Sequence, residues 1–170
     1  KRPANVRARY NYACELEKSG DLSSAKSEYA ETLRLDPRYY SAHNNLGVLL
    51  LRLSPHDQQT QKTALEHLST AARLQPNQHD IVFNLGKLQL NVGQNENAVK
   101  TLSRAVTLFP GQALYQFYLG RAQVAANQLE PAVASLDEAV RLEPALAQAQ
   151  IDLALALCRL NRVPESLKHY

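Results

Sequence analysis

The chain has 170 residues, of which 45% are hydrophobic and 21% are charged, and this balance excludes an intrinsically disordered chain. The net charge of +3 is spread thinly and forms no Lys and Arg block, so we expect no nucleic-acid partner. No apolar run approaches the ~18 residues that a membrane-spanning helix needs, so we expect no membrane span.

Helical segments follow one another along the whole chain, in pairs joined by short turns, and no strand is expected. Left-handed backbone that ends a helix suits Gly and, less easily, Asn, which mark the turns at Gly20, Gly93, Asn127 and Asn161. A further helix is predicted to begin near Pro164. In chain order, the other predicted helices span 6–18, 23–35, 40–53, 61–74, 79–91, 96–108, 113–126, 130–142 and 147–160.

Five prolines separate these pairs at regular intervals. Pro3, Pro37, Pro76, Pro110 and Pro144 stand 34, 39, 34 and 34 residues apart. Proline ends helices because it lacks the N–H group and fixes φ. A period of this length is typical of stacked two-helix repeats. The predicted repeats span 6–39, 40–78, 79–112 and 113–146, with a partial repeat at 147–170.

The longer step reflects five extra residues around 54–60. They are expected to lengthen the turn or the helix that follows it. Extra loop length costs little, because each doubling of a loop adds only about 0.6 kcal/mol. The insertion is therefore either a tolerated surface feature or a contact site at the edge of the array.

Small and large side chains recur at matched repeat positions. Small residues let the paired helices approach closely, and large ones fill the space between them. The eighth position holds Ala13, Gly47, Gly86, Gly120 and Ala154. The twenty-fourth holds Tyr29, Leu68, Leu102, Leu136 and Tyr170.

This pattern resembles the tetratricopeptide repeat (TPR) family, whose signature W-x2-L-G-x2-Y is followed by A-x3-F, A and P. One match is Leu119-Gly120 with Ala132, Leu136, Ala139 and Pro144, and the two preceding repeats match in the same register at Leu46-Gly47 and Leu85-Gly86. The tryptophan position departs from the family, since it holds Arg9, His43, Val82, Gln116 and Gln150. The resemblance implies an all-α fold, a right-handed α-solenoid of tandem helix-turn-helix repeats, with residues 1–170 forming a single array.

The ends of the chain fall inside the repeat pattern. The chain begins at Lys1 without an initiator Met, and Tyr170 falls within a helical pattern. We therefore expect a fragment of a longer repeat array.

In the TPR family, the first helix of each repeat lines a concave face that binds partners, and the same role is expected here. The predicted peptide-binding groove consists of Asn11, Asn44, Asn45, Arg52, Phe83, Asn84, Lys87, Phe117 and Arg121.

Each class of groove residue has two interpretations. The asparagines resemble the ladder that holds peptide backbone in O-linked N-acetylglucosamine transferases, but Asn before Leu-Gly is also common in TPR repeats without a ladder. Phe83 and Phe117 either anchor apolar side chains of a partner or pack against neighbouring repeats. The Lys and Arg residues either attract acidic groups or are ordinary solvated charges.

The two-carboxylate clamp of chaperone-binding TPR proteins does not match. Its Lys, Asn, Asn, Lys and Arg correspond here to Tyr10, Cys14, Asn45, Asp80 and Asn84, so one position of five agrees. Asp80 also has the wrong charge for binding a carboxylate. Acidic C-terminal tails of the EEVD type are therefore not expected as ligands.

No catalytic constellation is visible, so we expect no enzyme, no metal and no cofactor. The histidines have neither metal-ligand spacing nor a reproducible relation to a carboxylate or nucleophile. They are His43, His56, His67, His79 and His169. Cys14 and Cys158 lie too far apart along a solenoid for a disulfide, and two lone thiols favour a reducing, cytoplasmic compartment.

The sequence therefore predicts a protein–protein interaction module that binds a peptide segment or helix of a partner with hydrophobic and acidic residues. Two alternatives stay open: a substrate-positioning accessory domain of a larger enzyme, such as a glycosyltransferase, and a structural subunit of a multiprotein assembly. The partial last repeat would leave Leu153, Leu157 and Leu167 uncovered, which predicts end-to-end self-association.

Overall fold

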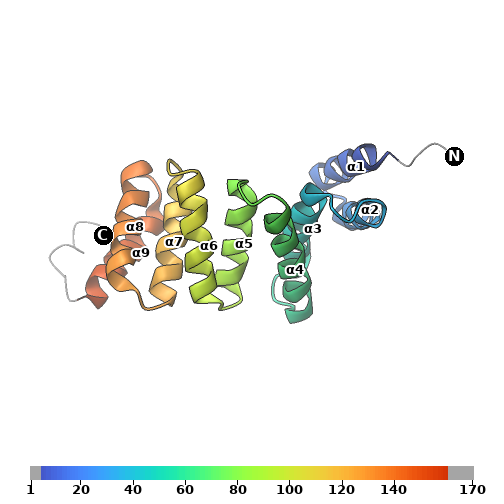
Figure 1. The fold of residues 1–170 in the computed structure, drawn as a ribbon. Helices are drawn as coiled ribbons and strands as arrows, with labels where there is room; N and C mark the ends of the chain where they lie inside the picture. Colours follow the sequence, from blue (N-terminus) through green and yellow to red (C-terminus); the bar gives the residue numbers. More distant parts are fainter. Residues whose placement is uncertain (1–4, 161–170) are drawn as a thin grey trace. The chain divides into compact units, whose positions relative to one another are not determined.

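A computed structural model of the chain describes residues 5–160. Predictions that concern Pro3, Asn161, Pro164, Leu167 and the rest of 161–170 lie outside these residues. Residues 5–160 form helices and turns and contain no strand (Figure 1). The helices are α1 (Val6–Ser19), α2 (Leu22–Leu35), α3 (Tyr40–Leu53), α4 (Gln58–Leu74), α5 (His79–Asn91), α6 (Asn95–Leu108), α7 (Ala113–Ala125), α8 (Leu129–Leu142) and α9 (Ala147–Arg159).

The predicted helices between 6 and 160 are confirmed, with the largest difference at α4. This helix begins at Gln58 rather than 61, and it has 17 residues where α2, α6 and α8 have 14 each. Asp57 caps it, since its carboxylate accepts a hydrogen bond from the Thr60 backbone N–H at 2.7 Å. Part of the insertion therefore extends α4, and its residues 54–59 are exposed.

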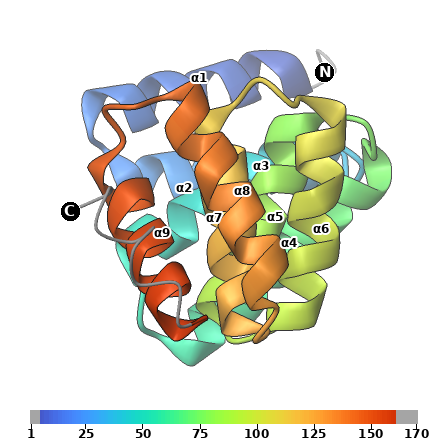
Figure 2. The ribbon, with the colours of Figure 1, turned by 90° about the vertical axis from the view of Figure 1, so that its left-hand side faces the viewer.

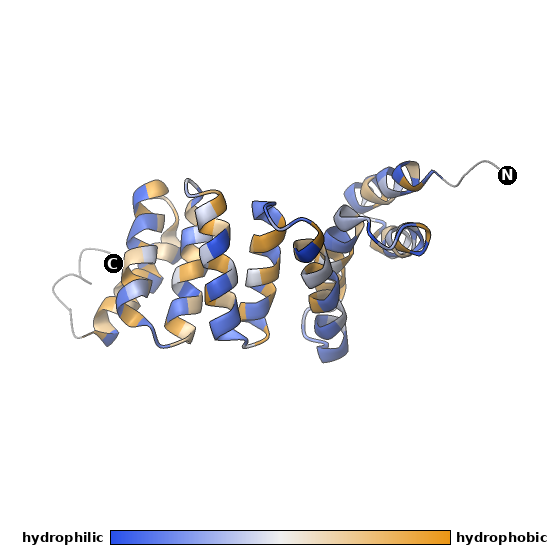
Figure 3. Cartoon of the chain, in the orientation of Figure 1, coloured by the Kyte–Doolittle hydropathy of each residue, from blue (hydrophilic) through white to orange (hydrophobic). Residues whose placement is uncertain are grey.

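The helices divide into two compact units, and the boundary falls inside α5, between Asn84 and Leu85. Unit 1 contains α1 to α4 and the first half of α5. Unit 2 contains the second half of α5 and α6 to α9. In unit 2, α8 and α9 lie side by side in both Figure 1 and Figure 2. Each helix carries both hydrophobic and hydrophilic residues (Figure 3), as expected for helices with one buried face.

The turns inside the helix pairs use the left-handed backbone that the sequence predicts. The φ angles are 89° at Gly20, 78° at Gly93 and 58° at Asn127. A Cβ atom is strained in this region, so Gly is preferred and Asn is the best tolerated substitute. These residues end the first helices and let the second helices fold back against them.

Close approach of paired helices explains the small residue at the eighth repeat position. A Cβ atom built on Gly120 would lie 2.6 Å from Leu136 Cγ, and one on Gly86 would lie 2.7 Å from Leu102 Cγ. The large residue at the twenty-fourth position therefore fills the space that the glycine leaves. This prediction from the repeat pattern is confirmed in both units, because Gly47 and Leu68 have the same relationship.

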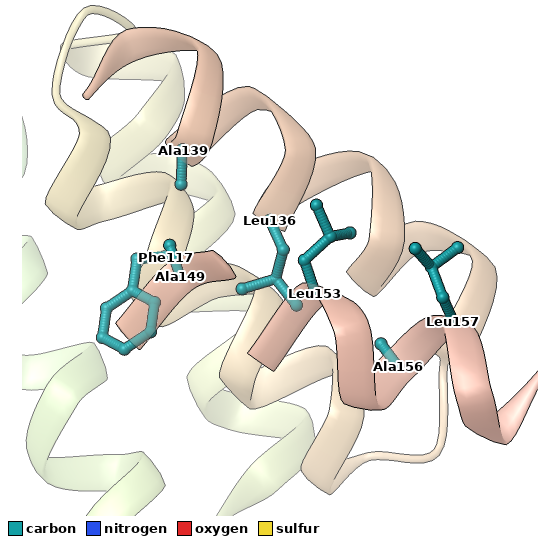
Figure 4. Packing of buried hydrophobic residues seen from close by; sticks show 7 residues of the cluster. All are labelled: Phe117, Leu136, Ala139, Ala149, Leu153, Ala156 and Leu157. Carbon is teal, nitrogen blue, oxygen red and sulfur yellow. The ribbon is translucent and has the colours of Figure 1, made fainter. Parts of the chain in front are cut away.

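A hydrophobic cluster in unit 2 joins α7, α8 and α9 (Figure 4). Leu136 of α8 and Leu153 of α9 point toward each other in its centre, and both are almost fully buried. Full burial of such a side chain contributes about 1.5–3 kcal/mol. The cluster consists of Phe117, Leu136, Ala139, Ala149, Leu153, Ala156 and Leu157.

Candidate functional site

The first helix of each pair carries the predicted groove residues, and they are divided between the two units. Asn11, Asn44, Asn45, Arg52, Phe83 and Asn84 belong to unit 1. Lys87, Phe117 and Arg121 belong to unit 2.

In unit 1, three asparagine side chains form a continuous row of hydrogen bonds. Asn84 Nδ2 donates to Asn44 Oδ1 at 3.0 Å, and Asn44 Nδ2 donates to Asn45 Oδ1 at 3.1 Å. Asn45 Nδ2 in turn donates to the hydroxyls of Tyr10 and Tyr29, both at 3.2 Å. The amides of Asn44 and Asn45 therefore link α1, α2, α3 and α5 to one another.

The row continues to a charged pair. The Tyr29 hydroxyl donates to Glu17 Oε2 at 2.9 Å, and Arg52 Nη1 lies 2.6 Å from Glu17 Oε1. Burial and the neighbouring Cys14 raise the pKa of Tyr10 to about 12 and also raise the pKa of Tyr29, so both hydroxyls keep their protons at neutral pH. Glu17 therefore compensates the charge of Arg52 from within the unit.

The other predicted residues of unit 1 lie outside this row. Asn11 is exposed on α1. Phe83 is buried, with 7% of its surface exposed. A side chain this inaccessible has little surface to offer a partner, so burial favours the packing interpretation of Phe83.

Unit 1 also contains a histidine pair that the sequence analysis missed. His43 Nδ1 and His67 Nδ1 lie 2.9 Å apart, and His43 Nε2 lies 3.0 Å from the Pro37 carbonyl oxygen. Burial and the neighbouring His43 lower the pKa of His67. The two residues are 24 positions apart and on different helices, so no local motif could have revealed the pair.

In unit 2, side chains from the three first helices α5, α7 and α9 surround a hollow of about 280 Å³. We call it the apolar hollow, because five of its seven lining residues are aliphatic. Its charged members are Arg121 and Asp152. The lining consists of Leu90, Arg121, Val124, Ala125, Asp152, Leu155 and Ala156.

Arg121, which lines the apolar hollow, shares the Tyr118 ring with a second cation, Lys87, which lies three residues before the lining residue Leu90 on α5. Lys87 Nζ is 5.4 Å from the centre of the Tyr118 ring, and the Arg121 guanidinium carbon is 5.9 Å from it. The same guanidinium is 5.6 Å from the centre of the Phe117 ring. These distances are within the range of cation–π attraction, which orients both cations on this surface.

Asp152 balances one of these cations. Its Oδ2 lies 3.6 Å from Arg121 Nε, and its Oδ1 accepts a hydrogen bond from Gln148 Nε2 at 2.9 Å. The carboxylate is thus held from both oxygens. The pair spans α7 and α9 at one side of the apolar hollow.

Phe117 lies beneath this surface. Only 5% of it is exposed, and it belongs to the hydrophobic cluster with Leu153 and Ala156 of α9. Of the two predicted roles, this placement favours packing between repeats. The ring also supports the Arg121 guanidinium from the inside.

The structure therefore brings Lys87, Phe117 and Arg121 together, and it adds residues that the predicted groove omitted. Tyr118 and Asp152 occupy the repeat position of Asn84, and Leu155 occupies that of Lys87, so both positions already belong to the predicted groove. Leu90 and Val124 occupy another groove-facing position, the twelfth, so the repeat register contained the information needed to find them.

A second hollow of about 510 Å³ lies at the turns of unit 2. It is lined by residues 93–97 and 125–127, and Asn95 Nδ2 donates to the Ala125 carbonyl oxygen at 2.9 Å across it.

Between residues 5 and 160 there is no group of three or more His, Cys, Asp or Glu side chains arranged to hold a metal. None of the helices in that range is long and apolar enough to cross a membrane.

A family model for the tetratricopeptide repeat matches the chain over residues 10–59, 62–113 and 117–170. The chain belongs to the tetratricopeptide repeat family. TPR repeats generally act as protein-binding scaffolds rather than as catalysts. No curated protein sequence matches the chain significantly.

Solved structures of other TPR proteins share this fold. MamA from Desulfovibrio magneticus RS-1 has a TM-score of 0.87 and 20% sequence identity, and the match covers 98% of this chain and 91% of that one. YrrB has a TM-score of 0.83 and 20% identity, with 95% of this chain and 80% of that one covered. The predicted fold class, an all-α solenoid of helix-turn-helix repeats, is confirmed.

Proposed function

We propose that this TPR scaffold binds a peptide segment or helix of a partner protein, and that an apolar side chain of the partner enters the apolar hollow of unit 2. The observation that carries the proposal is the hollow itself, an aliphatic depression bordered by charged groups on the face formed by the first helices. Apolar surface that is open to solvent and edged by polar groups is typical of a protein-binding site.

The size of the apolar hollow favours a side chain over a small molecule. Its volume of about 280 Å³ is at the lower limit of pockets that enclose whole small ligands, which begin at about 300 Å³. An aliphatic side chain would bury apolar surface against Leu90, Val124 and Leu155. Lys87 lies next to the hollow and favours a partner that also carries acidic groups, whereas Arg121 is already paired with Asp152.

A structural relative supports peptide binding as a function of this fold. YrrB is described as a TPR protein with an unusual peptide-binding site. For the present chain, we take residues 1–170 as one array with the predicted repeat boundaries at 6–39, 40–78, 79–112 and 113–146.

For the predicted groove residues of unit 1, contact with a partner remains a prediction, and their existing hydrogen bonds and ion pairs limit which of them are available. Asn44 and Asn45 already bind each other and two tyrosines, so a partner backbone would have to compete with these bonds. Asn84 also donates into this row, so Asn11, which lies outside it, is the better candidate for contact with a partner. Arg52 is compensated by Glu17 and would attract an acidic group less strongly than an unpaired cation.

The predicted uncovered surface at Leu153 and Leu157 is wrong, because both pack into the hydrophobic cluster and are only 1% and 3% exposed. A structural-assembly role is still a second candidate, because α9 carries other apolar residues that are uncovered. Ile151 is 43% exposed and Leu155 is 50% exposed. Phe117 occupies the same repeat position as Ile151, one repeat earlier, and the first helix of the next repeat, α9, covers it. A second copy of the chain could cover Ile151 in the same way, and light scattering over a range of concentrations would detect the association. The role of an enzyme accessory domain stays a prediction.

Selection from a random peptide library tests the proposed site. The protein should enrich peptides that share a large aliphatic or aromatic residue. Ala125→Trp, which fills the apolar hollow from an exposed position, should weaken their binding at least tenfold. Ala134→Trp introduces the same side chain at an exposed position on α8 and should leave binding unchanged. Equal binding by the wild type and Ala125→Trp would show that the peptides bind elsewhere.

A further inference from the structure

The charges around the apolar hollow are arranged in order across unit 2. Lys87 lies on α5, Arg121 on α7 and Asp152 on α9. Lys87 contacts the Tyr118 ring, and no carboxylate of residues 5–160 forms an ion pair with it. The α5 side of the hollow is therefore positive.

The α9 side carries the negative end of an ion pair, because Asp152 lies on α9 and its partner Arg121 on α7. Asp152 is paired with Arg121 at 3.6 Å, and Gln148 holds its other oxygen at 2.9 Å. Because Asp152 compensates Arg121, a partner carboxylate that approached Arg121 would also approach Asp152, and the two effects oppose each other. Lys87 is the remaining cation that can attract an acidic group without such a penalty.

A partner is therefore expected to meet opposite charges at the two ends of the apolar hollow. Packed helices lie about 8–10 Å apart, so the distance from α7 to either neighbour corresponds to about three residues of extended chain at about 3.3 Å each. An apolar residue in the hollow would then have one charged contact on each side, a few residues away.

We propose that Asp152 makes the apolar hollow selective for a bipolar segment, in which an apolar residue has an acidic residue on one side and a basic residue on the other. This inference rests on the proposed function. It differs from a general preference for acidic partners, since a segment with acidic residues on both sides places one of them against Asp152. Asp152 is the specificity-determining residue, and Gln148 positions it.

Three capped synthetic peptides test the inference. Each has Leu in the middle of a Ser and Gly background, with charged residues three positions away on both sides: Glu and Lys, Glu and Glu, or Lys and Lys. Fluorescence anisotropy should show the Glu and Lys peptide binding tightest. The other two should be weaker by about fivefold, the effect of about 1 kcal/mol for one exposed ion pair.

Variants of the protein should change this order. With Asp152→Lys, the Glu and Glu peptide should bind tightest. Asp152→Asn keeps the size of the side chain but removes its charge. The affinity for the Glu and Glu peptide should then come within about twofold of the affinity for the Glu and Lys peptide. Asp137→Lys changes the net charge equally at an exposed position on α8 and should leave the order as in the wild type.

The outcomes separate the two proposals. If the wild type binds all three peptides equally, or if Asp137→Lys acts like Asp152→Lys, Asp152 does not determine specificity. The proposed site would still stand if Ala125→Trp abolished binding of all three. If Ala125→Trp has no effect, the apolar hollow is not the binding site, and absence of binding by every peptide would contradict both proposals.

Discussion

The side-chain amide of Asn45 donates a hydrogen bond to the hydroxyl of Tyr29 at 3.2 Å and so joins α3 to α2. Tyr29 is fully buried, and its hydroxyl continues the row to Glu17. A residue that the sequence places on the binding face thus holds the helices of unit 1 together.

Replacing Asn45 should therefore reduce stability. Asn45→Ala leaves the buried Tyr29 hydroxyl without its amide donor, and such a loss costs about 1–3 kcal/mol of unfolding free energy. Urea denaturation followed by circular dichroism measures it. Asn11→Ala, at an exposed position on α1, is the control and should be nearly neutral. Equal stability of the two variants would mean that the asparagine row does not hold unit 1 together.

Replacement by Ala should destabilise the protein at Gly120 but not at Gly111. At Gly120 the new Cβ would lie 2.6 Å from Leu136 Cγ, so the paired helices must move apart. Overpacking of this kind costs about 1–3 kcal/mol, more than the gain of about 0.5–1 kcal/mol from removing a helical glycine. At Gly111 the Cβ meets nothing within 4 Å, and unfolding free energy should stay within about 0.5 kcal/mol. A neutral Gly120→Ala would contradict the close packing of α7 and α8.

Burial should distinguish two leucines of α9. Leu153 is 1% exposed within the cluster, and Leu155 is 50% exposed beside the apolar hollow. Leu153→Ala should lower the unfolding free energy by about 2–5 kcal/mol, because it leaves a cavity. Leu155→Ala should lower it by less than about 1 kcal/mol but weaken binding of apolar peptides. The reverse order of stabilities would refute the packing of α9.

The histidine pair predicts how stability depends on pH. The pKa of His67 is lowered in the folded state, chiefly by burial and then by His43, so the unfolded chain binds its proton more readily. This contribution to stability is complete above about pH 6.5, the usual value of histidine, and is lost as the pH falls toward the folded pKa.

Urea midpoints at about pH 7.5 and 5.5 measure this effect. His67→Gln should reduce the loss of stability on acidification, whereas His56→Gln, at an exposed position in the insertion, should not. An unchanged pH dependence in His67→Gln would exclude the pair as its source.

The sequence predicts the helices well because their causes are local. Helical periodicity, Gly20 and Gly93 in left-handed turns, and the small eighth residue are all encoded within one repeat. The earlier start of α4 was also encoded locally, in the Asp57 cap that the prediction did not use.

The parts that could not be predicted depend on how the helices pack against one another. Phe117 is buried because α9 covers it, and the pairing of His43 with His67 depends on how α3 packs against α4. The balance between Arg121 and Asp152 joins two different repeats. A residue's position within a repeat gives the direction it faces, but its accessibility and its partners come from the adjacent helices.

The central claim is that the apolar hollow of unit 2 receives a side chain of the partner. Methyl NMR spectra recorded during titration with the Glu and Lys peptide test it most directly. We predict saturating shifts for the methyl groups of Leu90, Val124 and Leu155, while those of Leu49 and Leu68, in the core of unit 1, stay in place. Saturable binding that leaves the three methyl signals of the hollow unmoved would contradict the account.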